Sequence, residues 1–315
     1  MHAWEKKGLI YCPDGRYDWN RSHAQVPVVH KVNDKVLRVY YSSRNVNNQS
    51  NTSYIDVAAD NPSIVLYEHD KPILQHGSIG TFDDCGIMPA CVTTHNDVVY
   101  LYYIGWTTKG TVPYQNSIGL ALSYDEGKTF SKYSEGPVLG QSVMEPFFTG
   151  TICVMNEANI WRAWYLSCIG WKIIDGKPES FYNIKYAESA DGIHWKCDGK
   201  VAIDLKNEDE GGLASATVIK EGNKYKMWFS FRGGKDFRSN INNSYRIGYA
   251  ESGDGINWER MDDRAGINIS DNGWDSFMIA YPYVIANDNK LLMFYNGNGF
   301  GKTGFGYATS DMMKQ

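Results

Sequence analysis

The chain has 315 residues and a formal net charge of -5. This acidic balance argues against a nucleic-acid-binding protein, which needs a basic face, and no apolar run approaches the roughly 20 residues of a membrane-spanning helix. The N-terminal segment MHAWEKKGLIYC lacks the apolar core of a signal peptide, so we expect a cytoplasmic protein without a membrane or nucleic-acid partner.

Similar segments recur along the chain. Residues 182–195 read YNIKYAESADGIHW and residues 245–258 read YRIGYAESGDGINW. A weaker copy, SIGLALSYDEGKTF at 117–130, has the residues of the Asp-box turn of sialidases. A self-similar chain of this kind indicates a repeat fold.

Each repeat begins with two predicted strands joined by a hairpin turn. Pro27, Pro89 and Pro282 stand near the start of first strands, where the missing N–H of proline is tolerated. The turns are rich in Asn, Asp and Gly, which favour hairpins. The first strands are predicted at 26–30, 88–92, 150–154, 215–219 and 281–285, and the second strands at 39–41, 101–103, 163–165, 227–229 and 293–295.

A third and a fourth strand flank the Asp-Gly turn of each repeat. We therefore predict an all-β fold, a five-bladed β-propeller with four antiparallel strands per blade, as a single domain over 1–315. A large β-sandwich or β-helix is the alternative. The segment 304–311 begins another repeat, and the residues at 4–7 match its missing half. The N-terminal strand is therefore expected to complete the last blade and close the ring.

The predicted topology separates two kinds of loop. The Asp-Gly turns lie on one face, so Asp125, Asp191 and Asp254 are expected to be structural. The loops between second and third strands lie on the other face, and they are long at 105–116, 169–183 and 232–244. Long loops on a rigid scaffold often carry function.

This pattern resembles the carbohydrate-active five-bladed propellers of glycoside hydrolase families 32, 43, 62, 68, 117 and 130 over the whole chain. In families 32 and 43, Asp directly precedes the proline of the first strand in two blades, and Glu lies two residues before it in another. The resemblance places these acids at Val26, Gly150 and Ala214. None can transfer a proton, and the Glu-Asp-Pro-Arg segment of family 130 is absent as well.

Other acids lie on the predicted loops that lead into the first strands. Asp83, Glu145 and Glu210 fall six residues before the proline position, Asp275 falls seven before it, and Asp84 adjoins Asp83. Hydrolysis of a glycosidic bond requires two carboxyl groups in different roles. Asp83 or Asp84 with Glu145 or Glu210 are the catalytic candidates. The alternative is that these acids cap loops by accepting backbone N–H groups.

Basic and aromatic residues supply the binding candidates. Arg44 and Arg232 follow the second strands of two repeats, and with Arg21 and His23 they could hold a carboxylate or phosphate. The alternatives are arginines paired with loop acids and a structural histidine. Further candidates near the expected funnel mouth are Gln25, Asp275, Trp106, Trp171 and Tyr281, of which the last three could stack on a sugar or simply pack.

No cofactor is predicted from the six cysteines, which show no metal-ligand spacing; Cys91 and Cys153 are expected to pack in the core. The resemblance allows a Ca²⁺ ion at the funnel centre, but no Asp-rich run is visible. The leading hypothesis is an enzyme that hydrolyses, phosphorolyses or transfers a glycosyl unit of an anionic or phosphorylated sugar. The alternative is a non-catalytic propeller that binds a glycan or nucleotide sugar.

Overall fold

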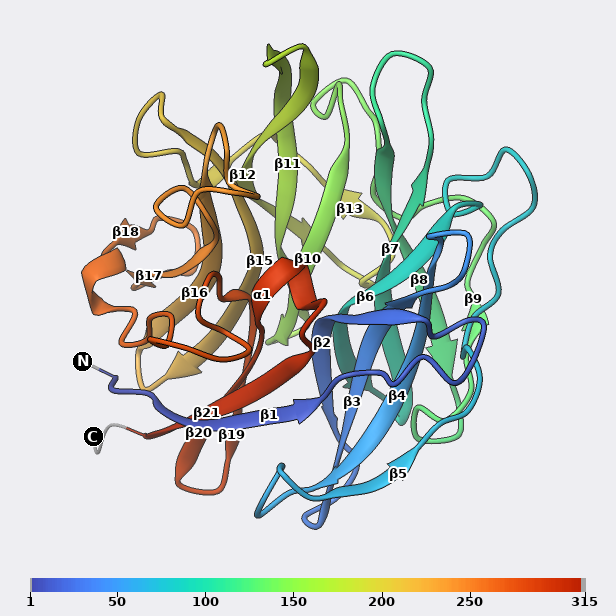
Figure 1. The fold of residues 1–315 in the computed structure, drawn as a ribbon, viewed down its shortest axis with the longest axis vertical. Helices are drawn as coiled ribbons and strands as arrows, with labels where there is room; N and C mark the ends of the chain where they lie inside the picture. Colours follow the sequence, from blue (N-terminus) through green and yellow to red (C-terminus); the bar gives the residue numbers. More distant parts are fainter. Residues whose placement is uncertain (1, 313–315) are drawn as a thin grey trace.

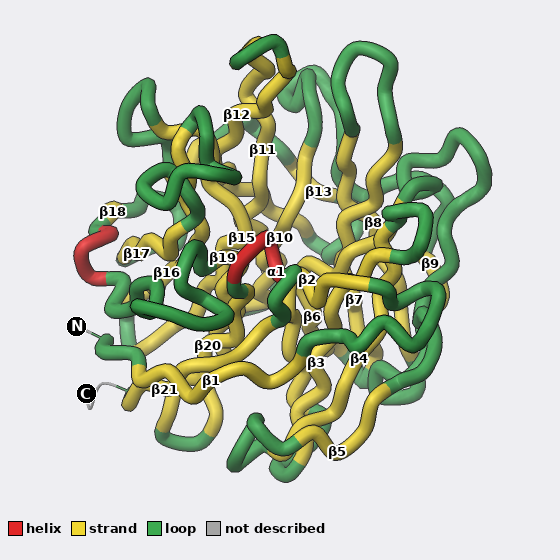
Figure 2. Tube along the Cα trace, in the orientation of Figure 1, coloured by secondary structure: helices red, strands yellow, loops and turns green. Residues whose placement is uncertain are grey.

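The computed structural model describes residues 2–312 and is almost entirely β, as predicted (Figure 2). Within this range the helical segments are one short α-helix, α1 (Asn298–Gly301), and one 3-10 turn, η1 (Asp262–Arg264). The described helices include none that is long and apolar enough to cross a membrane.

Within consecutive groups along the chain the strands pair antiparallel, and each group is led by a strand that contains one of the predicted first strands. Single parallel pairs, Ser50 with Gly86 and Tyr182 with Gly212, join the first group to the second and the third to the fourth. The first group is β2 (Ser22–Lys31), β3 (Val36–Arg44), β4 (Ser50–Ala58) and β5 (Val65–Glu68). The second is β6 (Gly86–His95), β7 (Val98–Thr107), β8 (Gln115–Ser123) and β9 (Ser131–Lys132). The third is β10 (Thr149–Glu157), β11 (Ile160–Ile174) and β12 (Lys177–Ser189), with β13 (Trp195–Lys196) and β14 (Val201–Ile203) both on β12.

The fourth group is β15 (Glu210–Glu221), β16 (Lys224–Gly233), β17 (Arg246–Ser252) and β18 (Glu259–Arg260). The last combines both ends of the molecule: β19 (Ala280–Asn287), β20 (Lys290–Asn296), β21 (Phe305–Asp311) and β1 (Glu5–Tyr11). Glu5 lies opposite Thr309 and Gly8 lies opposite Tyr307. The predicted pairing of the N-terminal strand with the last strand is therefore present, and the two termini lie side by side (Figure 1).

The leading strands of the groups surround a common centre (Figure 1). In order, β2 contacts β6, β6 contacts β10, β10 contacts β15, β15 contacts β19, and β19 contacts β2 again. Buried clusters fill the space between neighbouring groups. For example, Tyr40 and Tyr54 of the first group pack with Leu101 of the second, while Ile55 packs with Phe294 of the last. The predicted packing role of the cysteines agrees with their burial in these clusters, Cys91 in one and Cys153 in the next.

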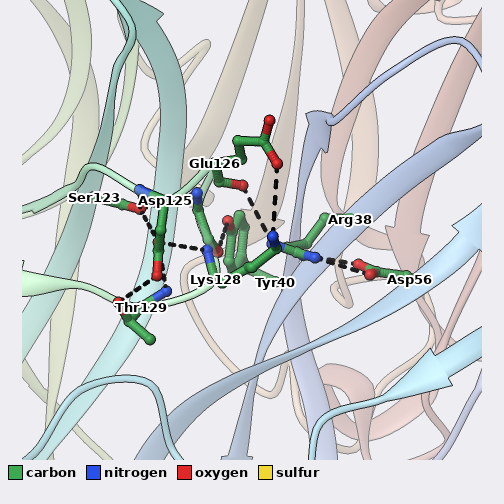
Figure 3. Close-up of polar contacts among 9 residues, drawn as sticks. Arg38, Tyr40, Asp56, Ser123, Asp125, Glu126, Lys128 and Thr129 are labelled. Atoms are coloured by element: carbon green, nitrogen blue, oxygen red, sulfur yellow. Dashed lines mark hydrogen bonds and ion pairs between the residues drawn. The ribbon is translucent and has the colours of Figure 1, made fainter.

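The Asp-Gly turns tie each group to its neighbour. In the second group the carboxylate of Asp125 accepts the backbone N–H groups of Lys128 and Thr129 at 3.1 and 2.9 Å, and the hydroxyls of Ser123 and Thr129 also donate to it (Figure 3). Gly127 has φ +77° and its carbonyl accepts the hydroxyl of Tyr40 from the first group at 2.6 Å. A Cβ atom at this glycine would lie 2.2 Å from that hydroxyl oxygen. The aspartate is thus structural, as expected.

Candidate functional site

A cavity of about 350 Å³ is lined by residues from every strand group, and we call it the central cavity. Its wall includes Gln25 of the first group, Met88 of the second, Tyr182 of the third, Arg232 of the fourth and Tyr281 of the last. The segments predicted as long loops contribute Trp106, Pro113, Tyr114, Glu179, Phe237 and Arg238. Trp106 lies on β7 and Glu179 on β12, because the hairpin of the third group continues as strand to Ile174 and again from Lys177, where a loop over 169–183 was predicted. The structure therefore brings the two arginines predicted to share a ligand, Arg44 and Arg232, to one cavity.

Arg232 carries a buried positive charge at this cavity. Its side chain is 2% exposed, and its guanidinium donates to the hydroxyl of Tyr182 at 2.9 Å and to the carbonyls of Gly233 and Ser180 at 2.8 and 2.7 Å. The guanidinium also lies over the ring of Phe237, 3.9 Å from its centroid. All these partners are neutral. An arginine cannot lose its proton in a protein, so the charge is retained without a carboxylate to balance it.

Arg44 has neutral partners as well. Its Nε donates to Gln25 Oε1 at 3.2 Å, and its Nη1 donates to Asn48 Oδ1 at 2.8 Å. The amide of Gln25 is fixed in turn, because its nitrogen donates to the carbonyl of Phe300 at 2.8 Å. The guanidinium of Arg44 is therefore held in place by groups that leave its charge uncompensated.

The cavity as a whole has an excess of positive charge. Its charged lining residues are Arg44, Arg232, Arg238 and Glu179. Glu179 accepts from Arg238 at 2.6 Å, so this pair cancels. Among residues 2–312 no ion pair is formed by Arg44 or Arg232. Two guanidiniums thus face the cavity in a protein whose net charge is -5.

Aromatic groups and hydroxyls complete the wall. The indole N–H of Trp106 donates to Ser50 Oγ at 3.1 Å, which fixes the ring at the cavity. The hydroxyls of Tyr182 and Tyr245 hydrogen-bond each other, next to Arg232. Of the predicted stacking residues, Trp106 and Tyr281 line the central cavity. Trp171 does not; its ring packs against Tyr114 and Phe148.

The three positions at which the resemblance places the hydrolase acids lie below this cavity. Val26, Gly150 and Ala214 all line a second cavity of about 140 Å³ that shares Gln25 and Tyr281 with the central cavity. The three positions to which the resemblance points thus share one cavity. Their side chains provide no carboxylate there.

The four acids that precede the first strands occupy equivalent buried sites outside the central cavity. Each is paired with a base and, in three cases, with the tyrosine at the same position of a second strand. Asp83 accepts from Lys132 at 2.6 Å and from Tyr103 at 3.1 Å, and Glu145 accepts from Lys185 at 2.9 Å and from Tyr165 at 2.8 Å. Asp275 accepts from Lys6 at 2.6 Å and from Tyr295 at 3.0 Å. Glu210 accepts from two nitrogens of Arg260 at 2.6 and 2.8 Å.

These contacts favour a structural role for the four acids. Burial raises the pKa of Tyr103, Tyr165 and Tyr295, so their hydroxyls remain protonated donors. None of the four acids lines the central cavity, although they were expected at its mouth. Asp84, the fifth acid, accepts the backbone N–H of Gly80 at 2.9 Å in a loop turn. Their catalytic or ligand-binding assignment stays a prediction.

Two further binding candidates also lie outside the lining of the central cavity. Arg21 is exposed, and it donates to Asp18 at 2.6 Å and to the carbonyl of Gly15 at 2.8 Å, which is the surface pairing kept as the alternative. His23 contacts Ser22 Oγ at 2.8 Å through Nδ1. Burial, together with Arg44 and Lys302, lowers the pKa of His23 to about 4, so the ring is neutral at neutral pH.

Sequence reasoning missed a recurring polar position. Asn116, Tyr182 and Tyr245 each stand seven residues before the serine of an Asp-Gly turn, and all three line both cavities. This shared position in the repeats was visible in the sequence. Among residues 2–312 no group of three or more His, Cys, Asp or Glu side chains could hold a metal ion.

The fold is that of the β-propeller glycoside hydrolases, which confirms the resemblance at the level of structure. A glycosyl hydrolase from Bacteroides ovatus matches with a TM-score of 0.72 at 14% identity, covering 99% of this protein and 94% of that one. A thermostable family-43 glycoside hydrolase matches with a TM-score of 0.68 at 18% identity, covering 92% and 88%. The family-32 β-fructofuranosidase of Bombyx mori matches with a TM-score of 0.62 at 15% identity, covering 98% and 61%.

Closer relatives exist at the level of sequence. The protein is 37% identical over 306 residues to the uncharacterized proteins MT1551 and Rv1502 of Mycobacterium tuberculosis, covering 97% of its own length and 98% of each relative. It belongs to the family of these two proteins. No protein-family model matches it.

Proposed function

We propose that this protein binds an anionic or phosphorylated carbohydrate in the central cavity. The observation that carries the proposal is the pair of guanidiniums, Arg44 and Arg232, which face one cavity and have neutral partners. A carboxylate or phosphate would supply the missing negative charge, and arginine can bond two oxygens of either group at once. Trp106 and Tyr281 offer aromatic faces for a sugar ring.

The architecture behind this site, in our proposal, is a five-bladed propeller forming one domain over residues 1–315. The consecutive antiparallel groups are its blades, and β1 completes the last one. The proposal is supported by the contacts of the leading strands, which pass from β2 through β6, β10, β15 and β19 back to β2. A ring of this kind leaves a central funnel in which loops from every blade meet.

Glycosyl hydrolysis, phosphorolysis or transfer is the second candidate function. It is favoured by the glycoside hydrolase fold and by Glu179, a carboxylate in the lining of the central cavity. Against it, Glu179 is paired with Arg238, and the positions of the family acids are Val26, Gly150 and Ala214. A reaction that needs two carboxyl groups has one at this cavity. Binding without turnover therefore fits the geometry best.

Isothermal titration calorimetry tests the proposal with glucuronic acid, galacturonic acid and glucose 6-phosphate, each beside glucose and galactose. We expect at least one anionic sugar to bind and the neutral sugars to bind at least tenfold more weakly. Arg44→Gln should weaken the anionic sugar about tenfold or more, because a hydrogen bond to a charged group contributes about 1.5–3 kcal/mol.

Arg21→Gln is the matched control, since this arginine pairs with Asp18 outside the cavity lining and its loss should leave affinity unchanged. Equal binding of neutral and anionic sugars, or unchanged affinity in Arg44→Gln, would contradict the proposal. Products should be sought in the same mixtures by anion-exchange chromatography, and their release would favour the second candidate.

A further inference from the structure

The second cavity, which we call the floor cavity, opens from the base of the central cavity. Seven side chains line both, among them Gln25, Tyr182 and Tyr281. The remaining wall of the floor cavity is made of Val26, Ile104, Phe148, Gly150, Thr151, Leu166 and Ala214. A ligand whose charged group contacts Arg44 and Arg232 can therefore extend into the floor cavity.

The remaining wall is apolar and firmly held. Thr151 is its one polar residue, and the Oγ1 of Thr151 already accepts the backbone N–H of Ser215 at 2.7 Å. Phe148 and Leu166 are buried in one cluster with Ala214, and the Phe148 ring packs against Tyr114 and Trp171. The floor cavity is thus preformed rather than opened by movement of its walls.

The seven residues of this remaining wall form an apolar end of the floor cavity, and this end selects against hydroxyl groups, whereas polar groups of the shared residues lie at the other end. A hydroxyl placed among such side chains loses its hydrogen bonds to water and finds no replacement, which costs about 1–3 kcal/mol. Apolar cavities of about 150 Å³ stay dry and bind small apolar molecules such as xenon or benzene. A sugar ring with all its hydroxyls free is therefore a poor occupant, whereas a methyl, methoxy or acetyl group fits both the size and the chemistry.

We propose that the floor cavity is a subsite for an apolar substituent, an O-methyl, deoxy-methyl or acetyl group, carried by the anionic carbohydrate of the central cavity. This inference rests on the proposed function. Polar groups are available at the level where the two cavities meet: Asn116 and Tyr281 line both, and within residues 2–312 neither the Asn116 amide nor the Tyr281 hydroxyl has a hydrogen-bonded protein partner. These groups would bond the ring that joins the charged and apolar ends.

Calorimetry with pairs of equal charge tests the subsite: glucuronic acid against 4-O-methylglucuronic acid, and glucose 6-phosphate against N-acetylglucosamine 6-phosphate. We expect the substituted member of at least one pair to bind about tenfold tighter, the usual effect of one small apolar group in a fitted pocket. Ala214→Val fills the floor cavity and should abolish this preference, chiefly by weakening the substituted member.

Two further variants guard against a folding defect in Ala214→Val. Leu166→Ala enlarges the floor cavity and should shift the preference toward the larger acetyl group. Ala216→Val makes the same change two residues along β15, in a different buried cluster, and should leave the ratio unchanged. Equal affinities within both pairs in the wild-type protein would overturn the subsite, even where the dependence on Arg44 upholds the proposed function.

A ligand-independent measurement separates the two proposals completely. Crystals pressurised with xenon should show an anomalous peak between Val26, Leu166 and Ala214, and the peak should be absent in Ala214→Val. Ordered water in place of xenon would overturn the inference about the floor cavity, but the proposed binding of an anionic carbohydrate by Arg44 and Arg232 would stand. Failure of every anionic probe together with a xenon peak would reject the proposed function and, with it, the carbohydrate assigned to the subsite.

Discussion

Some buried ionic groups in this protein have a partner of opposite charge and others have neutral partners, and the sequence alone does not distinguish the two kinds. Glu210 is surrounded by the two nitrogens of Arg260 that donate to it, whereas Arg232 has only neutral acceptors among the described residues. The sequence predicted both near the funnel mouth, because Glu210 falls six residues before a first-strand position and Arg232 follows a predicted second strand. It could not show the partner, since Arg260 lies 50 residues away on β18.

Replacing Glu210 by alanine should destabilise the protein without affecting the ligand. The change leaves Arg260 buried with Asp262, at 2.9 Å, as its remaining carboxylate partner among the described residues. The cost should therefore be about 1–3 kcal/mol, below that of a buried charge that loses its only partner. Urea denaturation measures the loss, and calorimetry with the anionic sugar should show affinity within twofold of the wild type. Asp263→Ala, at an exposed acid on η1, is the control and should change stability by less than about 0.5 kcal/mol. Loss of ligand affinity in a folded Glu210→Ala protein would restore this acid to the site.

The same comparison explains why the arginines were easier to place than the acids. Arg44 and Arg232 lie at the C-terminal ends of the second strands β3 and β16, and both line one cavity, so strand position alone was enough to place them together. The acids lie on loops whose course depends on distant bases such as Lys132 and Lys6. The local sequence pattern is therefore enough to predict where the arginines lie, whereas the positions of the acids depend on tertiary contacts.

Among the elements, the Asp-Gly turns were the most predictable. Asp191 and Asp254 repeat the contacts of Asp125, each accepting two backbone N–H groups at 2.8 Å. The carbonyl of the turn glycine accepts from an aromatic side chain of the preceding group: Tyr102 donates to Gly192 at 2.7 Å, and Trp164 donates to Gly255 at 2.8 Å. These turns depend on residues within a few positions, so the sequence is sufficient to identify them.

The turns should make the protein sensitive to acid. Although burial opposes ionisation, hydrogen bonds from Thr129 and Ser123 lower the pKa of Asp125 to about 2, below its ordinary value of 3.8. A group whose pKa is lowered by folding stabilises the folded state above its unfolded pKa, and this contribution is lost as the pH falls toward the folded value. Stability should therefore decline between about pH 4 and pH 2.

Urea midpoints at pH 6 and pH 3 measure this effect. Asp125→Ala should lower the midpoint at pH 6 and reduce the difference between the two pH values. The exposed Asp271 provides the control, and Asp271→Ala should preserve the wild-type difference. An unchanged difference in Asp125→Ala would show that this turn does not contribute to the acid sensitivity.

At the scale of the whole molecule, the spacing of the repeats was enough to predict the all-β fold and the partner of β1. The segments around the cavity could be predicted from the sequence, but their contacts could not, because Glu179 on β12 pairs with Arg238 on a loop of the next group. The floor cavity was also beyond the sequence. Its wall combines single residues from several strand groups, and no local sequence pattern predicts how far apart these residues lie in space.

Deleting residues 1–11 tests the contribution of β1. The deletion exposes the backbone groups of β21, and an unpaired edge strand is a template for association with other chains. It also removes Trp4, which is buried against Trp228 with ring centroids 5.5 Å apart. We expect a lower thermal midpoint and concentration-dependent aggregation in light scattering. A deletion of residues 1–3 should behave closer to the full-length protein, and a monomeric, equally stable 12–315 protein would contradict this role.

The pairing of Glu5 with Thr309 also sets an order of events during synthesis. About three hundred residues must be translated between the two partners, which takes roughly 15–60 s at 5–20 residues per second. Through that interval the native partner of β1 does not yet exist. Lys6 and Lys7 on this strand carry charge that discourages premature pairing with a neighbouring nascent polypeptide. The two strands that close the last group are thus separated in synthesis by all the other strands described.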